Sequence, residues 1–125
     1  MALVIQNEVK KAALDGVTPV FNAGFFVLLS AADAELAKLT FNATAFAAAS
    51  SGSPSVAASN SIQADNSVTA GTITKFQLLN SSSQLRINGT VGVGSGDLLV
   101  TDNVVPSNAT QVSCTGGLSL SLQLS

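Results

Sequence analysis

The chain has 125 residues and a net charge of −2 at pH 7; 46% of its residues are hydrophobic and only 10% are charged. This length fits one domain with its own core. The five cations are scattered, and the longest apolar run, residues 25–29, is far below the ~20 residues of a membrane-spanning helix. Neither a nucleic acid nor a membrane is therefore an expected partner.

Residues 3–15 are predicted to form a helix, because apolar residues recur on one face and polar residues on the other. The apolar face carries Ile5, Val9, Ala12 and Ala13, and the polar face carries Gln6, Asn7, Lys10 and Lys11. Gly16 is the predicted stop signal. Since so short a helix is marginal alone, residues 1–16 are expected to be a helical arm that docks on the protein's own sheet or on a partner.

Two strands and a turn are predicted after the helix. Residues 20–29 are rich in aromatic and branched side chains, which favour a strand, and residues 30–34 form the predicted turn. Residues 37–41 alternate apolar and polar side chains, the pattern of a half-buried strand.

Residues 42–60 consist mainly of small side chains, which bury little area and barely offset the cost of ordering the backbone. We expect an extended, low-complexity loop here, with Phe46 as its one anchor. Because a loop this long is usually functional or disordered, contact with a neighbouring molecule is its expected use.

Short strands are predicted from residue 61 to the end of the chain. They cover residues 61–65, 72–79, 85–93, 98–100, 104–106, 111–114 and 118–124, with a hairpin loop at 80–83. The pattern predicts an all-β fold: one domain over 1–125, in which residues 17–125 form an antiparallel, jelly-roll-like β-sandwich or barrel behind the short N-terminal helix.

The residues that usually carry catalysis or bind metals are scarce. Histidine is absent and Cys114 is the only cysteine, so one chain cannot assemble a structural zinc site. A calcium site from Asp97 and Asp102 is one alternative to solvated turns, but their spacing matches no calcium loop. The glycine-rich run 92–97 fails the dinucleotide fingerprint and indicates a flexible turn. We expect no enzyme activity, cofactor or metal.

One stretch of the chain resembles a known group of proteins. Residues 72–92 hold an aromatic strand, a Ser-rich hairpin and the run Asn88-Gly-Thr-Val-Gly92, followed by Gly96-Asp97-Leu98 and a Leu-rich final strand. This order resembles small structural proteins of tailed phages, and the opening Met-Ala-Leu-Val fits the same group. The group usually has Trp before the central Phe, whereas Lys75 stands here, which changes what this strand can pack against.

The resemblance implies a virion protein, most directly a head decoration or cement protein. Such proteins bind the outer capsid surface, commonly as homotrimers, and clamp neighbouring subunits of the major capsid protein. The alternatives are a tail- or fibre-associated structural or receptor-binding protein and a cellular adhesive or shell protein. The polar first residues do not match a signal peptide, so synthesis in the host cytoplasm is expected. The candidate partner contacts are Val4, Ile5, Val9, Phe46 and Val56.

Overall fold

The structure is a computed structural model and describes residues 5–52, 54–100, 102–114 and 117–122. Helix α1 (Asn7–Val17) leads into a 3-10 helix, η1 (Thr18–Phe21). The strands are β1 (Phe25–Leu29), β2 (Glu35–Phe41), β3 (Ser55–Ala58), β4 (Ile62–Gln63), β5 (Gly71–Thr72), β6 (Lys75–Leu79), β7 (Arg86–Gly92), β8 (Leu98–Leu99), β9 (Val104–Val105) and β10 (Ser119–Leu122).

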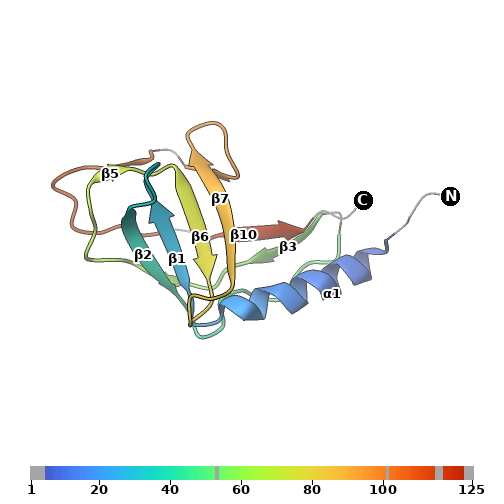
Figure 1. The fold of residues 1–125 in the computed structure, drawn as a ribbon. Helices are drawn as coiled ribbons and strands as arrows, with labels where there is room; N and C mark the ends of the chain where they lie inside the picture. The colour runs from blue at the N-terminus through green and yellow to red at the C-terminus, as the bar shows by residue number, and fades with distance from the viewer. Residues whose placement is uncertain (1–4, 53, 101, 115–116, 123–125) are drawn as a thin grey trace.

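The main sheet is curled and mixed (Figure 1). Its strand order is β4-β2-β1-β6-β7-β8, and β1 pairs antiparallel with both β2 and β6. The last pair, β7 with β8, is parallel. The prediction of a strand-rich fold with one short helix is confirmed, but the prediction of a purely antiparallel sheet is wrong, and two packed sheets of a sandwich are not clearly present among the described residues.

The parallel pairing of β8 with β7 depends on the tight loop that connects these two strands. The chain leaves β7 at Gly92 and comes back beside it, with Gly92 opposite Leu99. A Cβ at Gly92 would lie 1.8 Å from the carbonyl oxygen of Ser95, and Gly96 has a φ of 125°. Glycine is needed at both positions of this loop. A side chain at position 92 would collide with the backbone, and one at position 96 would be strained by the positive φ. The run predicted as a flexible turn is therefore sterically demanding.

A second part of the molecule extends from the main sheet (Figure 1). β3 pairs antiparallel with β10, and α1 lies along this pair. We call β3, β10 and the adjoining segment 45–50 the ribbon. Segment 45–50 runs along the other side of β3, because the N–H of Ala47 donates to Ala58 and the N–H of Ser50 donates to Val56.

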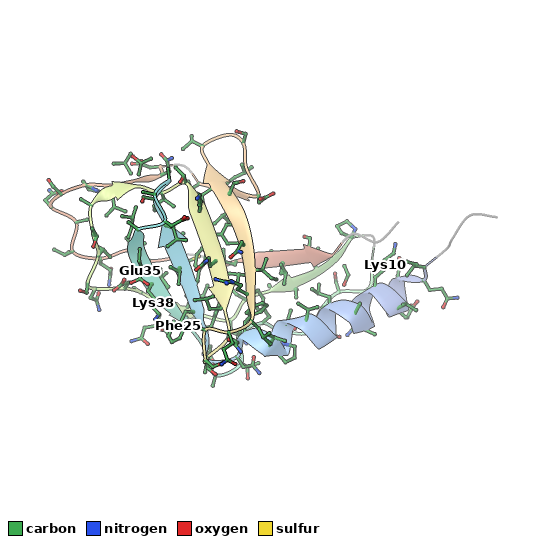
Figure 2. The ribbon with its side chains drawn as sticks, in the orientation of Figure 1. Lys10, Phe25, Glu35 and Lys38 are labelled. Carbon is green, nitrogen blue, oxygen red and sulfur yellow. The ribbon has the colours of Figure 1, made fainter. Side chains whose placement is uncertain are left out.

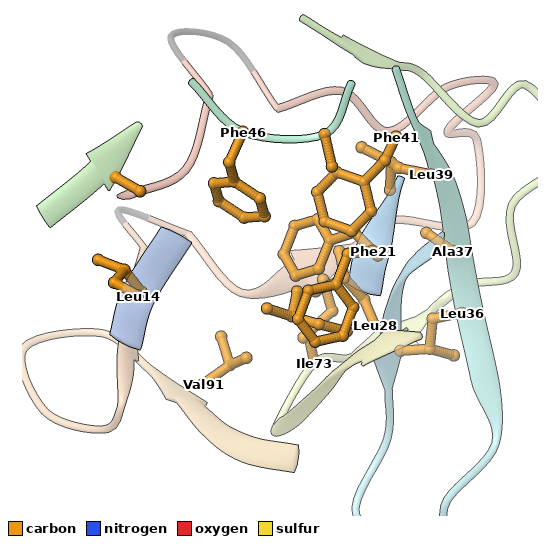
Figure 3. Close-up of a cluster of buried hydrophobic side chains, with 14 of the residues drawn as sticks. Leu14, Phe21, Leu28, Leu36, Ala37, Leu39, Phe41, Phe46, Ile73 and Val91 are labelled. Carbon is orange, nitrogen blue, oxygen red and sulfur yellow. The ribbon is translucent and has the colours of Figure 1, made fainter. Parts of the chain in front are cut away.

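The core fills the inner face of the curled sheet and continues under the helix (Figure 3). Phe26 of β1 lies 6.5 Å from Phe41 of β2, and Phe41 lies 5.6 Å from Phe46, measured between ring centroids. Leu14 of α1 is 1% exposed and belongs to the same cluster. The helix is thus a structural part of the domain, since removing it would open this core.

The outer face of the sheet holds a smaller apolar cluster of Val27, Leu29, Leu79 and Phe25. The ammonium of Lys38 lies 4.1 Å from the centre of the Phe25 ring, and Figure 2 shows these two side chains on neighbouring strands. Lys75, at the position where the resemblance expects Trp, lies opposite Leu29 and binds Asp33 at 2.8 Å. Long cationic side chains thus flank this cluster where an aromatic ring was expected.

The loop predicted over residues 42–60 is an ordered part of the fold over the residues described there. It contains β3 and a bridge between Phe46 and Ser59. Its small side chains are buried: Ala45, Ala49, Ser55 and Ala57 are each at most 4% exposed. The loop prediction is wrong for residues 55–58, which form β3, whereas residues 42–52 remain largely irregular and Phe46 is buried as the expected anchor. Small residues allow the helix and ribbon to pack closely, a tertiary effect that composition does not encode.

Other element boundaries differ from the sequence pattern in detail. The helix runs from Asn7 to Val17, so Gly16 does not stop it. The strand predicted over 20–29 starts at Phe25, because η1 occupies the first part. The strand predicted over 72–79 is divided between β5 and β6, and 111–114 contributes only a bridge at Val112. The turn at 30–34 and the hairpin loop at 80–83 are confirmed.

Candidate partner-binding surface

Helix α1 packs on the ribbon through the side that carries Lys10 and Leu14. Lys10 is 6% exposed and Leu14 is 1% exposed, and Thr18 follows them into the interior at 4%. These three positions are spaced four residues apart, so they lie on one side of the helix. Of the two expected docking places, the protein's own sheet and a partner, the structure shows α1 packed on the protein's own ribbon.

The apolar side of α1 faces solvent. Val9 is 53% exposed and Val17 is 37% exposed, and Ala12, Ala13 and Gly16 between them are also exposed. Ile5 precedes the helix and is half-buried. We call Val9, Ala12, Ala13 and Gly16 the outer face of α1. These four residues are apolar or small, and the exposed carboxylate of Glu8, one helical turn before Ala12, borders them.

One carboxylate connects α1 to the ribbon. Asp15 accepts a hydrogen bond from the ammonium of Lys11 one turn earlier, at 2.6 Å, and another from the backbone N–H of Ala49 in the ribbon, at 2.8 Å. These two bonds, the ammonium of Lys11 first, lower the pKa of Asp15 below its usual value. The bond to Ala49 holds the Asp15 carboxylate toward the ribbon. The apolar residues Val9, Ala12, Ala13 and Gly16 lie on the solvent-facing side.

Of the five predicted partner contacts, the four that the structure describes differ widely in exposure. Val9 is the most accessible, and Val56 is half-buried in β3. Phe46 is 5% exposed and lies against Phe41, so its prediction as a partner contact is corrected: it anchors the core and is not available to a neighbour. Val4 lies outside the described residues.

The acidic residues considered for calcium have structural partners. Asp97 accepts hydrogen bonds from the N–H and the hydroxyl of Thr90, at 3.0 and 3.2 Å, and so holds the loop after β7. Asp102 accepts a bond from the N–H of Val104 at 3.0 Å. Among the described residues, no group of three or more acidic, Cys or His side chains is placed to hold a metal ion.

A half-open pocket of about 390 Å³ lies at the inner face of the main sheet. Apolar residues such as Phe26 and Leu39 form most of its wall, and Asp102 and Cys114 are the ionisable residues among those described there. Burial raises the pKa of the Cys114 thiol. A protonated thiol is a poor nucleophile.

No family model, curated protein or solved structure matches this chain. In the part of the chain that the structure describes, no helix is both long enough and apolar enough to span a lipid bilayer. The surfaces themselves are therefore the observations that bear on function, and the outer face of α1 is the most distinctive of them.

Proposed function

We propose that this chain is a non-enzymatic virion protein that decorates the capsid of a tailed phage. It would bind the outer capsid surface and stabilise the shell by clamping neighbouring subunits of the major capsid protein. The proposal combines the resemblance of residues 72–98 to phage structural proteins with the character of the exposed surface. The observation that carries it is the outward-facing apolar stripe of α1, Val9, Ala12, Ala13 and Gly16.

An exposed apolar helix face supports binding to a protein surface. Burying apolar side chains contributes roughly 25 cal/mol per Å² removed from water. The small residues Ala12, Ala13 and Gly16 let another backbone come close, and Val9 supplies a larger contact beside them. A capsid subunit that presents an apolar groove is a partner of matching chemistry, because helix-in-groove binding uses residues at this spacing.

The first prediction concerns Val9. In a binding titration against capsids of the virus that encodes this chain, assembled without it, Val9→Lys should weaken attachment by about 30-fold or more. The reason is that the substitution places a charge on the largest apolar side chain of the proposed contact. Val104→Lys is the matched control, since Val104 is 51% exposed against 53% for Val9 but lies in β9.

Two results would contradict the proposal. One is wild-type protein that fails to bind these capsids, and the other is equal loss of binding for the Val9 and Val104 variants. Quantification of the protein in purified virions separates decoration from a tail location. A copy number comparable to that of the major capsid protein supports decoration, and a copy number far below it supports a tail or fibre protein.

A further inference from the structure

Strand β10 is an open edge of the ribbon. β3 has segment 45–50 on one side and β10 on the other, so its hydrogen-bonding groups are used in both directions. β10 pairs with β3 alone among the described residues. On its other side, no strand among the described residues pairs with the backbone donors and acceptors of β10.

The alternation of the ladder identifies which groups face outward. The N–H of Ser59 donates to the carbonyl of Leu118 at 2.7 Å, so residue 118 points its backbone groups at β3. In an antiparallel ladder every second residue does so, which places the N–H and C=O groups of Ser119 and Ser121 on the open side.

The usual protections of an edge strand are missing from β10. Edge strands commonly carry a charge, a proline or a bulge that prevents another strand from pairing. Ser119–Leu122 contains neither a charge nor a proline, and its pairing with β3 has no register shift. Residues 39–64 and 103–125 contain no Asp, Glu, Lys or Arg, so the ribbon is neutral around this edge.

The sequence of β10 is complementary to itself. When two copies run antiparallel, the outward groups of Ser119 meet those of Ser121 in the other copy, and Leu120 lies opposite its own counterpart. Each face of the joint sheet then stays uniform, because Leu meets Leu on the half-buried face and Ser meets Ser on the exposed face. No charges repel one another across this seam.

We propose that β10 binds β10 of a second copy of this chain around a two-fold axis at Leu120, which extends the two ribbons into one continuous sheet. Such an interface is isologous, the arrangement of most protein dimers; it closes after two copies and so differs from the homotrimer that the resemblance implies. The four residues that each copy contributes make a small interface, so association depends on protein concentration. This inference does not depend on the identity of the partner of α1.

Analytical ultracentrifugation of the wild-type chain over a range of concentrations tests the interface. We expect a monomer–dimer equilibrium that Ser121→Pro abolishes, because proline removes an outward N–H without touching a bond to β3. The melting temperature of Ser121→Pro should stay close to that of the wild type. Leu120→Pro is the contrasting variant, since it removes a bond to β3 and should lower the melting temperature.

A disulfide tests the register. Residues opposite each other in a non-hydrogen-bonded pair have Cα atoms about 4.5 Å apart, within the range that a disulfide bridges. In a Cys114→Ser background, Leu120→Cys should form a cross-linked dimer on mild oxidation, and Ser82→Cys in the exposed β6–β7 loop should not. A wild type that stays monomeric at every concentration, self-association that survives Ser121→Pro, or equal cross-linking of both cysteine variants would each overturn the proposal.

Discussion

At the scale of single residues, two glycines of the same chain have opposite roles. Gly24 connects η1 to β1, and a Cβ there would lie 2.0 Å from the carbonyl oxygen of Leu79 and 2.9 Å from that of Phe21. Both contacts are backbone atoms, which cannot move aside as a flexible side chain would. Gly16 lies in α1, and a Cβ added there would meet no atom within 4 Å. The first glycine is required by packing, and the second is not.

This contrast gives a prediction for paired alanine substitutions. Gly24→Ala should lower the free energy of unfolding by about 3 kcal/mol, because the added methyl group overlaps the backbone of β6. Gly16→Ala should raise it by about 0.5–1 kcal/mol, since alanine favours a helix where space is open. Urea denaturation of both variants measures the two changes, and equal effects would contradict the geometry.

Asp15 makes the stability of the molecule depend on pH. Its pKa is lowered in the folded state, so its contribution is fully present above the unfolded value, about 3.9, and is lost as the pH falls through the folded value. Asp15→Asn should be less stable than the wild type at neutral pH, and the difference should shrink below about pH 4.

Thermal melts at a series of pH values measure this difference. Asp33→Asn is the matched control, because it removes the other carboxylate–ammonium pair found among the described residues, a more exposed one with Lys75. That exposed pair should contribute less than about 1 kcal/mol. A gap between Asp15→Asn and the wild type that stays constant down to pH 2 would rule out the linkage.

At the scale of elements, α1 has two faces with separate tasks. The inner side carries Leu14 into the core, next to the buried alanines of the ribbon. The outer side carries Val9 and remains open. A truncation of residues 1–16 would remove both faces at once, so single substitutions are the sharper test of each.

Leu14 and Val17 separate the stability of the helix from its surface chemistry. Leu14→Ala should lower the free energy of unfolding by about 2–5 kcal/mol, because it leaves a cavity at a side chain only 1% exposed. Val17→Ala, at 37% exposure, should change it by less than about 1 kcal/mol. Chemical denaturation followed by circular dichroism checks both values, and a small effect at Leu14 would show that the helix is not docked as described.

At the scale of the whole molecule, the two proposed contacts lie on the same extension. The outer face of α1 and the open edge of β10 both belong to the part that projects from the main sheet (Figure 1). The curled sheet supplies most of the core and thereby holds this extension in place. A protein with separate surfaces for itself and for a partner is suited to a repeating assembly.

Much of the sheet could be predicted from the sequence by itself. Alternation over residues 37–41 and the Ser-rich hairpin at 80–83 are local signals, and β2 and the β6–β7 hairpin follow them. The absence of histidine removes the commonest catalytic base on composition alone. These strands and the hairpin depend on residues close together in the sequence, so their hydrophobic and turn patterns can be read from the sequence.

The exposure of the two candidate surfaces, the outer face of α1 and the edge of β10, depends on tertiary structure. The apolar stripe of α1 was visible in the sequence, but its outward orientation goes with long-range contacts of the opposite side, the burial of Leu14 in the core and the bond between Asp15 and Ala49. Likewise, the small residues around β3 carry almost no local signal, and they form a strand because α1 and β10 pack against them. The sequence determines which residues are apolar, and only long-range contacts determine which of them remain exposed.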